Sequence, residues 1–548
     1  MPAWSLALSL LVMGPLLAPG YLLLRDAVST PRSYLTDAAL GLSEAAPRAL
    51  PQDFAVAVLS SVVDGGVVVK ALLLAGLWLA GWGSARLVAT VLPDAGLPAQ
   101  VVAATLAIWN PYVAERLLQG HWSLLVGYGC LPWVAVAVLR LRDGDGNWWP
   151  LVGFTAVAGL TPTGLMLAAT VALVCCAAPG TGRPRWACGG VALGAAVLGA
   201  LPWLVASTAG GSLASSPAVG VQAFAARAEP GLGTLVSLAG LGGIWNGDAV
   251  PDSRTTVFAV VATVVLLAVV AVGLPVVIRR PAAVPLLVLA VVAVVGPALM
   301  ATGPGLAAVE SIMRTVPGLG VLRDGQKWVA LAVPGYALAA GAAVVTKRDR
   351  IPAVATAAVC CAALLAVLPD LAWGVGGKMT AVRYPAGWQT VAAAINADPR
   401  PVAVLPPDSM RVFAWSGAAP VLDPLPRWVA ADVLSTGDLI IGGQTIPGEG
   451  TRAREVQRLL LDGADAAALR RAGVGWVVVE GPAPALDLPV AHHDADLTLY
   501  RVGGDQPPAA HRGLLIGAHL VWAGAIAVAV LGAGVAAVRR RRVARPAR

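Results

Sequence analysis

The sequence predicts a polytopic α-helical membrane protein of about twelve spans, with one small α/β domain near its C-terminus. Two observations carry this prediction. Hydrophobic residues make up 57% of the 548 residues and charged residues only 12%, about half the charged share of an ordinary soluble domain. A soluble core cannot bury so much apolar surface, so the bilayer must be the solvent for most of the chain. The second observation is a change of composition over 374–510, where charged residues, prolines and Gly-Gly pairs return.

Apolar runs of spanning length alternate with loops that hold most of the charge. The run 4–24 is expected to be a retained first span rather than a cleaved signal peptide, because no positive residue precedes it. The segment 150–179 is interpreted as a short hairpin of two half-spans broken at 161–164, since Pro and Gly lie together there; a single span would place Arg183 and Arg185 on the opposite side. The remaining spans are expected at 56–83, 101–113, 123–139, 187–206, 255–277, 282–301, 328–345, 351–373 and 514–538.

Basic clusters fix the expected orientation. With the N-terminus inside, all five fall on the cytoplasmic side, as the positive-inside rule requires. Both termini are then cytoplasmic, and 374–510 lies outside. The Arg-rich tail follows an apolar span directly, which favours an anchor against anionic lipid over a nucleic-acid arm. The clusters are Arg140/Arg142, Arg183/Arg185, Arg279/Arg280, Lys347/Arg348/Arg350 and Arg539–Arg542.

The chain therefore divides into a transmembrane part (1–373), an exported α/β domain (374–510) and a final span with a basic tail (511–548). Strands are expected at 402–405, 475–479 and 497–502, and amphipathic helices at 452–461 and 464–472. No GxGxxG or P-loop spacing follows a strand, so no nucleotide site is predicted. The six cysteines lie in or beside apolar runs, which indicates neither a disulfide framework nor a zinc site.

Asp26 is the first candidate for chemistry, because it lies at the outer end of the first apolar run. Its carboxylate could act as a general base on an acceptor hydroxyl, or hold a divalent cation that bridges a lipid phosphate. The plainer alternative is a solvated helix end paired with Arg25. Asp37, Glu44 and Asp53 share the same loop and are weaker candidates.

The most polar stretch of the apolar N-terminal half is 110–122. It holds Glu115, Arg116 and His121, and its Arg and His could bind a phosphate or pyrophosphate headgroup. The alternative is a capped interfacial turn whose Asn-Pro ends a helix.

A third candidate is the turn Arg323-Asp324-Gly325-Gln326-Lys327, just before an expected span. Arg323 and Lys327 are four residues apart and could hold an anionic lipid phosphate, with Asp324 orienting them; an ordinary ion-paired helix start is the alternative. Two weaker candidates are the loop 244–248, which could contact carbohydrate but reads better as a turn, and the pair His492-His493, which has too few further ligands nearby for a metal.

Four features point to one family. They are the acidic loop after the first apolar run, the broken hairpin, the C-terminal exported domain and the stretch Asn110-Pro111-Tyr112 … Arg116-Leu117-Leu118-Gln119-Gly120-His121-Trp122. In these features the chain resembles the GT-C superfamily of polyprenyl-phosphate-sugar-dependent glycosyltransferases. The likeness is to actinobacterial envelope arabinofuranosyl- and mannosyltransferases. It implies transfer of a sugar from a polyprenyl-phosphate lipid to a glycan or glycolipid acceptor on the outer membrane face, with membrane lipid and no nucleic acid as partner. The expected catalytic carboxylate matches Asp26. Many members carry two adjacent acidic residues there, where this chain has Arg25-Asp26.

The leading hypothesis is therefore a glycosyltransferase. Asp26 would be the base, and Arg116, His121, Arg323 and Lys327 would bind the donor phosphate, with Glu115 and Asp324 beside them. A transporter or flippase of an envelope precursor remains an alternative, although Asp64 and Lys70 are the only ionisable residues within spans and no repeat is evident. A non-catalytic assembly protein is the third. The site requires that three turns far apart in sequence meet in one place.

Overall fold

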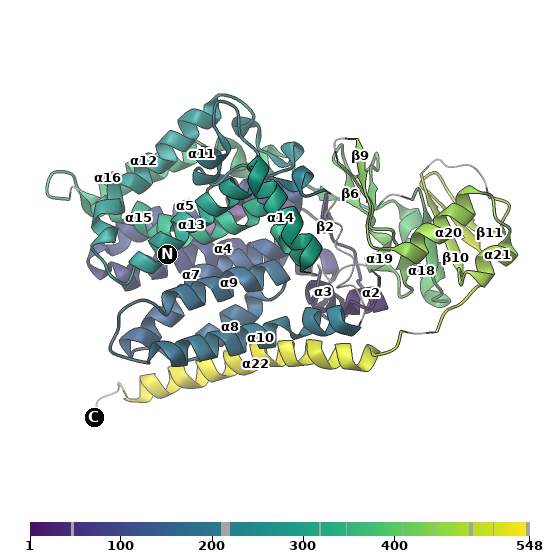
Figure 1. Cartoon of the computed structure of the whole chain (residues 1–548), viewed down its shortest axis with the longest axis horizontal. Helices are drawn as coiled ribbons and strands as arrows, with labels where there is room; N and C mark the ends of the chain where they lie inside the picture. Colours follow the sequence, from purple (N-terminus) through teal and green to yellow (C-terminus); the bar gives the residue numbers. More distant parts are fainter. Residues whose placement is uncertain are drawn as a thin grey trace.

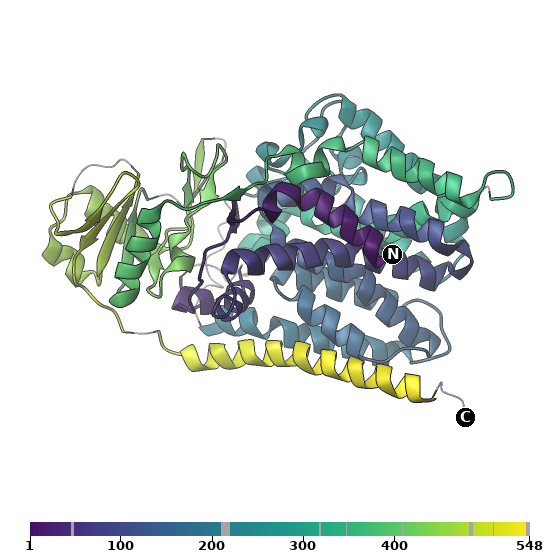
Figure 2. The ribbon, with the colours of Figure 1, turned by 180° about the vertical axis from the view of Figure 1, so that it is seen from behind.

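A bundle of helices and a small C-terminal sheet domain make up the molecule (Figures 1 and 2). The computed structural model describes residues 1–44, 49–209, 220–316, 319–346, 348–407, 409–441, 443–481, 486–507 and 509–543. The N-terminus and the end of the C-terminal helix lie on the side of the helical body away from the C-terminal domain (Figures 1 and 2).

Long apolar helices identify a multi-pass, membrane-embedded protein. Among the described residues six helices are long and apolar enough to cross a bilayer, or up to eight if each of two bent pairs is one span. Twelve spans are therefore not confirmed. The six are α4 (Gly65–Val91), α7 (Trp122–Asp143), α10 (Arg185–Ala209), α12 (Phe258–Ile278), the continuous run η8 (Gly325–Ala332) and α15 (Val333–Thr346), and α22 (Arg512–Val543).

The two bent pairs account for the expected spans 282–301 and 351–373. Helix α13 (Val284–Met300) meets α14 (Gly303–Thr315) at 91°, and α16 (Ala353–Ala366) meets the segment Pro369–Gly376 at 74°. That second segment comprises η9 (Pro369–Leu371) and α17 (Ala372–Gly376). A proline follows each break, Pro304 in the first pair and Pro369 in the second, and Pro cannot continue a helix because it lacks the N–H that the next turn needs.

Short helices explain most of the shortfall in spans. The expected first span 4–24 is too long: α1 (Pro2–Met13) passes into η1 (Gly14–Leu17), and the chain then becomes strand β1 (Tyr21–Leu24). Two Gly/Pro pairs, at 14–15 and 19–20, break the helix. Helix α5 (Gly96–Ile108) has 13 residues, about 20 Å, which is less than the hydrocarbon thickness.

The expected broken hairpin is confirmed. Helix α8 (Trp149–Ala158) ends before the break and α9 (Pro162–Cys175) begins after it. Thr161 caps α9, because its Oγ1 accepts from the Gly164 N–H at 3.0 Å. Both helices pack on α7 and on each other.

Helix α7 is the centre of the body, with 89% of its apolar window buried. It crosses α4 through two glycines: a Cβ added to Gly129 would lie 2.2 Å from the Gly76 carbonyl oxygen. Small residues allow such close backbone approach in membrane bundles, where dispersion contacts rather than water exclusion hold helices together.

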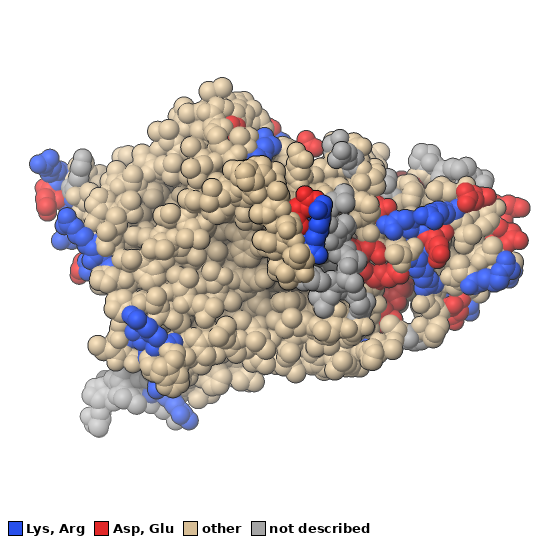
Figure 3. Space-filling view, viewed as in Figure 1, with Lys and Arg blue, Asp and Glu red and all other residues tan. Residues whose placement is uncertain are grey.

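Charge is distributed unevenly over the surface. Figure 3 shows few charged residues over the helical body, mostly Lys and Arg at its end away from the C-terminal domain, and mixed charges on that domain. Helix α7 ends at this basic end with Arg140 and Arg142. Arg142 closes the connection to α10, donating to the carbonyls of Ala178 at 3.0 Å and Arg183 at 2.5 Å. Lys347, from one expected basic cluster, lies outside the described residues.

The C-terminal domain is a five-stranded sheet of order β11-β12-β10-β4-β7. Its three parallel strands are β10 (Trp476–Glu480), β4 (Val402–Leu405) and β7 (Val433–Leu434), of which β7 forms one edge. The antiparallel strands β12 (Leu497–Arg501) and β11 (Val490–His493) complete the other edge. Helices α18 (Ala386–Ala397), α20 (Thr451–Leu461) and α21 (Ala466–Arg471) complete the domain. The strands and helices expected from the sequence are confirmed to within two residues.

The N-terminal segment joins the two parts of the molecule. Strand β1 pairs with β3 (Ala381–Val382), and β2 (Ala27–Val28) pairs with β1. Leu23 and Val28 lie in the hydrophobic core of the C-terminal domain. The boundary expected at residue 373 therefore divides the sequence, but residues from before it pack in the core of the C-terminal domain.

The first loop's carboxylates hold this junction. Asp53 pairs with Arg427 at 3.3 Å, and Glu44 accepts from the Thr451 hydroxyl at 2.8 Å. Asp37 binds Arg512 at the start of α22. These side chains have structural partners, which leaves Asp26 as the carboxylate of this loop beside the other candidate turns.

Replacing Gly129 by alanine is expected to destabilise the protein by about 1–3 kcal/mol, because the new methyl group overlaps the α4 backbone. Gly194 on α10 is the matched control, since nothing lies within 4 Å of a Cβ added there. Thermal unfolding in detergent, followed by fluorescence-detected size exclusion, should show a lower midpoint than wild type for Gly129→Ala and an unchanged midpoint for Gly194→Ala. Equal midpoints would contradict the α4–α7 contact.

Candidate functional site

Three turns that are far apart in sequence meet at the end of the helical body that faces the C-terminal domain. Asp26 follows β1, His121 lies between α6 (Pro111–Gln119) and α7, and Asp324 precedes η8. The His121 Nε2 lies 2.9 Å from Asp26 Oδ2, and the Gln119 amide donates to the same oxygen at 3.1 Å. Arg116 binds Asp324 at 2.8 Å.

Helix α6 presents the central residues. Asn110 caps it by accepting from the Val113 N–H at 3.1 Å, and Pro111 occupies the first turn, where its missing N–H costs nothing. The Asn-Pro pair therefore follows the end of α5, at Ile108, as expected, and it also begins α6. All nine residues of α6 are buried, so this polar stretch is an internal element and not an interfacial turn.

Gly120 ends α6 in the left-handed region, with φ of +84°. It also lets two segments touch: a Cβ at this position would lie 2.3 Å from the Ala27 nitrogen and 2.4 Å from the Leu24 oxygen. The Asp26 N–H donates to the Gln119 carbonyl at 3.2 Å in the same contact. The backbone carrying Asp26 is thus seated directly on the end of α6.

Arg116 lies at the centre of a buried network. Its guanidinium makes a two-point contact with Asp324, at 2.8 and 3.2 Å, and donates to the Gln326 side-chain oxygen. A further N–H group points to His121 Nδ1 at 3.0 Å. The Arg116 side chain is 0% exposed and that of Asp324 6%, so this cation is neutralised inside the protein and does not face the surface.

Glu115, the neighbour of Arg116, holds a different segment. Its carboxylate accepts from the backbone N–H groups of Gly243 and Ile244, both at 3.1 Å, and from the Gln326 amide at 2.9 Å. The loop 244–248 is fixed further by Asn246, whose amide donates to Gln119 Oε1 at 2.8 Å. Glu115 is therefore a buried structural carboxylate at the back of the site.

Four of the expected residues face outward. Side-chain exposure is 38% for Asp26, 18% for His121 and 23% for Lys327, and Arg323 is partly exposed. Lys327 Nζ lies 3.8 Å from Asp324 Oδ2. The Arg323 guanidinium lies over the Phe224 ring, 4.4 Å from its centroid. The site thus presents one carboxylate with cationic groups beside it.

The surroundings set which groups are charged. Burial opposes ionisation of Asp26, but the hydrogen bond from His121 and that from Gln119 hold its pKa below the usual value. Burial lowers the pKa of His121, more than the Asp26 carboxylate raises it. Burial also opposes ionisation of Asp324, yet Arg116 and Lys327 bring its pKa to about 2. At neutral pH Asp26 and Asp324 are therefore ionised and the His121 imidazole is neutral.

Arg25 positions Asp26 from the other side. Its backbone has φ of +48°, a rare conformation for a residue with a side chain. Its N–H donates to the Pro420 carbonyl and its own carbonyl accepts from Leu422, both at 2.9 Å. The guanidinium donates to the carbonyl oxygens of Leu118 at 2.6 Å and Asp248 at 2.7 Å. Arg25 therefore ties the C-terminal domain to α6 through the residue next to Asp26.

Gln119, Gln326, Asn246 and Arg25 were not predicted as site residues. Gln326 and Gln119 lay inside the polar stretches that the sequence singled out, but a neutral amide carries no signal without its partner. The side-chain contacts that give them roles join residues up to 223 positions apart.

Other predicted candidates lie elsewhere. His492 pairs with Asp494 at 2.9 Å and His493 with Thr498 at 2.8 Å, within one β-hairpin of the C-terminal domain. Among the described residues no group of three or more His, Cys, Asp or Glu side chains could hold a metal ion.

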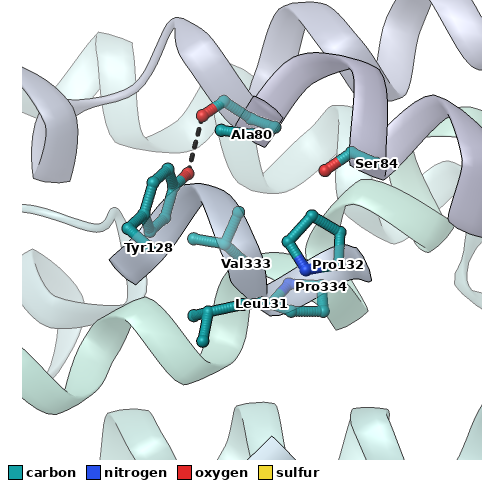
Figure 4. Close-up of a pocket in the computed structure, with 8 residues that line it drawn as sticks. Ala80, Ser84, Tyr128, Leu131, Pro132, Val333 and Pro334 are labelled. Carbon is teal, nitrogen blue, oxygen red and sulfur yellow. Dashed lines mark hydrogen bonds between the residues drawn. The ribbon is translucent and has the colours of Figure 1, made fainter. Parts of the chain in front are cut away.

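Two cavities of the described part of the chain lie away from Asp26. One of about 10 Å³ lies between α4, α7 and α15 (Figure 4), beside Tyr128, whose hydroxyl donates to the Ala107 carbonyl at 2.6 Å. It has room for about one water molecule. An open groove of about 470 Å³ lies over α20 in the C-terminal domain.

No family model matches the chain, and no curated protein or solved structure is significantly similar to it.

Replacing Gly120 by alanine is expected to lower stability by about 1–2 kcal/mol for the left-handed backbone and by about 1–3 kcal/mol more for the overlap with residues 24–27. Gly144 is the matched control: it ends α7 with φ of +89°, and the nearest atom to its added Cβ lies at 3.5 Å. Thermal midpoints of the two alanine variants separate the terms. A Gly120→Ala midpoint no lower than that of Gly144→Ala would contradict the close contact.

Proposed function

We propose that this protein is a membrane glycosyltransferase that moves a sugar from a polyprenyl-phosphate donor to an envelope glycan or lipid acceptor. The observation that carries the proposal is the convergence of a partly exposed carboxylate, Asp26, with the cationic side chains of Lys327 and Arg323 at one end of an apolar helical body. A carboxylate beside cations suits a hydroxyl acceptor and a phosphate leaving group. The apolar body suits a donor carried on a lipid.

The reaction balances with these groups. The acceptor hydroxyl gives its proton to Asp26 while its oxygen forms a bond to the anomeric carbon of the donor sugar. The bond between that carbon and the phosphate oxygen breaks, and the oxygen leaves with the electron pair. Lys327 and Arg323 stabilise the negative charge that develops on the lipid phosphate. Arg116 was expected among the phosphate ligands, but its burial against Asp324 suits a role in positioning.

The distribution of basic residues supports an outward-facing site. Helix α7 begins beside His121 and ends with Arg140 and Arg142, so the site and this basic cluster lie at opposite ends of the same helix. Its 22 residues extend about 33 Å, which is the thickness of a bilayer core. With the basic end in the cytoplasm, Asp26 and the C-terminal domain lie on the outer face.

The likeness to GT-C glycosyltransferases belongs to this proposal, with Asp26 as the catalytic carboxylate. Many members carry an acidic residue next to the catalytic one. Here Arg25 takes that position and donates hydrogen bonds to the carbonyl oxygens of Leu118 and Asp248. One acidic residue is enough for a single proton transfer.

The transporter alternative has less support. Asp64 caps α4 by accepting from the Gly66 and Val67 N–H groups, and the Lys70 ammonium donates to the Ala18 carbonyl at 2.7 Å. Both ionisable residues expected within spans thus have structural partners. A non-catalytic assembly protein would tolerate the loss of Asp26, which the first experiment below decides.

Asp26→Asn is expected to lower sugar transfer at least 100-fold, because an amide cannot accept the hydroxyl proton. The assay is incubation of membranes holding the variant with radiolabelled polyprenyl-phosphate arabinose or mannose and an envelope glycan acceptor. Asp94→Asn is the control and should transfer normally, because Asp94 is 77% exposed and makes only a long contact of 3.8 Å with Arg280. Wild-type transfer by Asp26→Asn, at equal protein level, would refute the mechanism.

Lys327→Met is expected to lower kcat/KM for the lipid donor by about 10- to 100-fold, because a charge on the leaving phosphate loses its partner. Lys327→Arg should retain most of the activity, since it keeps a cation at the same place. Steady-state kinetics over donor concentration distinguishes the variants. A methionine variant as active as the arginine variant would remove Lys327 from the donor site.

A further inference from the structure

The geometry points to a positioning role for His121: Arg116 locks it in the tautomer whose Nε2–H donates to Asp26, and it does not carry the reaction's proton. This inference rests on the proposed function, in which Asp26 is the base.

The tautomer follows from the chemistry of the two neighbours. A guanidinium has only donors, so the Arg116 N–H that lies 3.0 Å from His121 Nδ1 requires a lone pair on that nitrogen. The proton of a neutral imidazole must then be on Nε2. That nitrogen lies 2.9 Å from Asp26 Oδ2, which is an acceptor when ionised. One arrangement of protons satisfies both contacts.

Arg116 cannot turn away to free Nδ1. The other three N–H groups on its terminal nitrogens bind both carboxylate oxygens of Asp324 and the side-chain oxygen of Gln326, and the side chain is 0% exposed. A positively charged imidazole would need a proton where the guanidinium already donates. The charged groups that face His121 are Asp26, Arg116, Lys327 and Asp324.

The two oxygens of Asp26 thereby take different roles. Oδ2 accepts from His121 and Gln119, whereas Oδ1 accepts no hydrogen bond from the residues that the structure describes. Two donors on one oxygen fix the orientation of the carboxylate and leave Oδ1 for the acceptor hydroxyl. The chain of hydrogen bonds from Arg116 through His121 to Asp26 therefore orients Oδ1 toward the acceptor.

The tautomer can be measured without substrate. The chain has five histidines, and the full-length protein, labelled with ¹⁵N-histidine in lipid nanodiscs, should give one signal pair that disappears in His121→Gln. We expect this pair to report protonated Nε2 and unprotonated Nδ1 from pH 8 down to 6.5, because burial lowers the pKa of His121. An imidazolium or a protonated Nδ1 in this range would overturn the inference, whatever the protein transfers.

Two amide variants of His121 distinguish a role in orienting the Asp26 carboxylate from a role in proton transfer. Glutamine keeps a neutral N–H donor near the position of Nε2, whereas asparagine reaches only toward Arg116. His121→Gln is expected to retain at least one third of the transfer activity and His121→Asn to lose it at least tenfold. Equal, severe losses in both would indicate a proton carrier and contradict the proposal. Loss of transfer in Asp26→Asn but not in His121→Gln keeps the base and the positioning residue distinct.

The pH profile adds a readout that a merely structural role would not move. In the wild type, protonation of His121 breaks this chain of hydrogen bonds, so the acid limb of kcat should have its midpoint below the ordinary histidine pKa of 6.5. In His121→Gln this limb should move to lower pH, because only Asp26 remains to titrate. An unchanged limb in the glutamine variant would show that His121 does not set it.

Discussion

The buried ion pair between Arg116 and Asp324 is the contact on which the rest of the site depends. It joins the short helix α6 to the start of the η8–α15 span, 208 residues away in sequence. Breaking such a pair by removing one partner costs about 3–5 kcal/mol, because the other charge is left buried and unpaired. The cost enforces one arrangement of the two segments. Gln326 and Glu115 extend this network to the backbone of residues 243 and 244, so hydrogen bonds fix three segments relative to one another.

The C-terminal domain is part of the site's construction rather than an appendage. Strand β1 completes a sheet with β3, and Leu23 and Val28 enter the domain's core. Arg25, with its left-handed backbone, is bonded on one side to Pro420 and Leu422 and on the other to Leu118. Strained residues persist only where surrounding contacts over-determine them. The direction in which Asp26 points is therefore set jointly by α6 and by the domain.

Charge in the site is divided between an inner and an outer layer. Arg116, Asp324 and Glu115 are buried and neutralise each other or bind backbone N–H groups. Asp26, Lys327 and Arg323 remain accessible. Fixed inner charges hold the outer ones without reorganisation, which is how preorganised sites stabilise charge that develops during a reaction. His121 lies between the layers, in contact with Arg116 on one side and Asp26 on the other.

The sequence by itself determined the membrane character, the broken hairpin and the strands and helices of the C-terminal domain, because these follow from composition, periodicity and Pro/Gly punctuation within short windows. It also indicated three turns that carry polar side chains although apolar segments surround them. Only the tertiary structure decided that those turns meet, that Arg116 faces Asp324 and not solvent, and that Asp37, Glu44 and Asp53 hold the junction with the domain and α22. The same applies to the spans, since a 13-residue apolar helix inside a bundle and a true span look alike in composition. The physical reason is that the role of a side chain or a helix depends on what it packs against, and here polar side chains find partners in segments up to 477 residues apart.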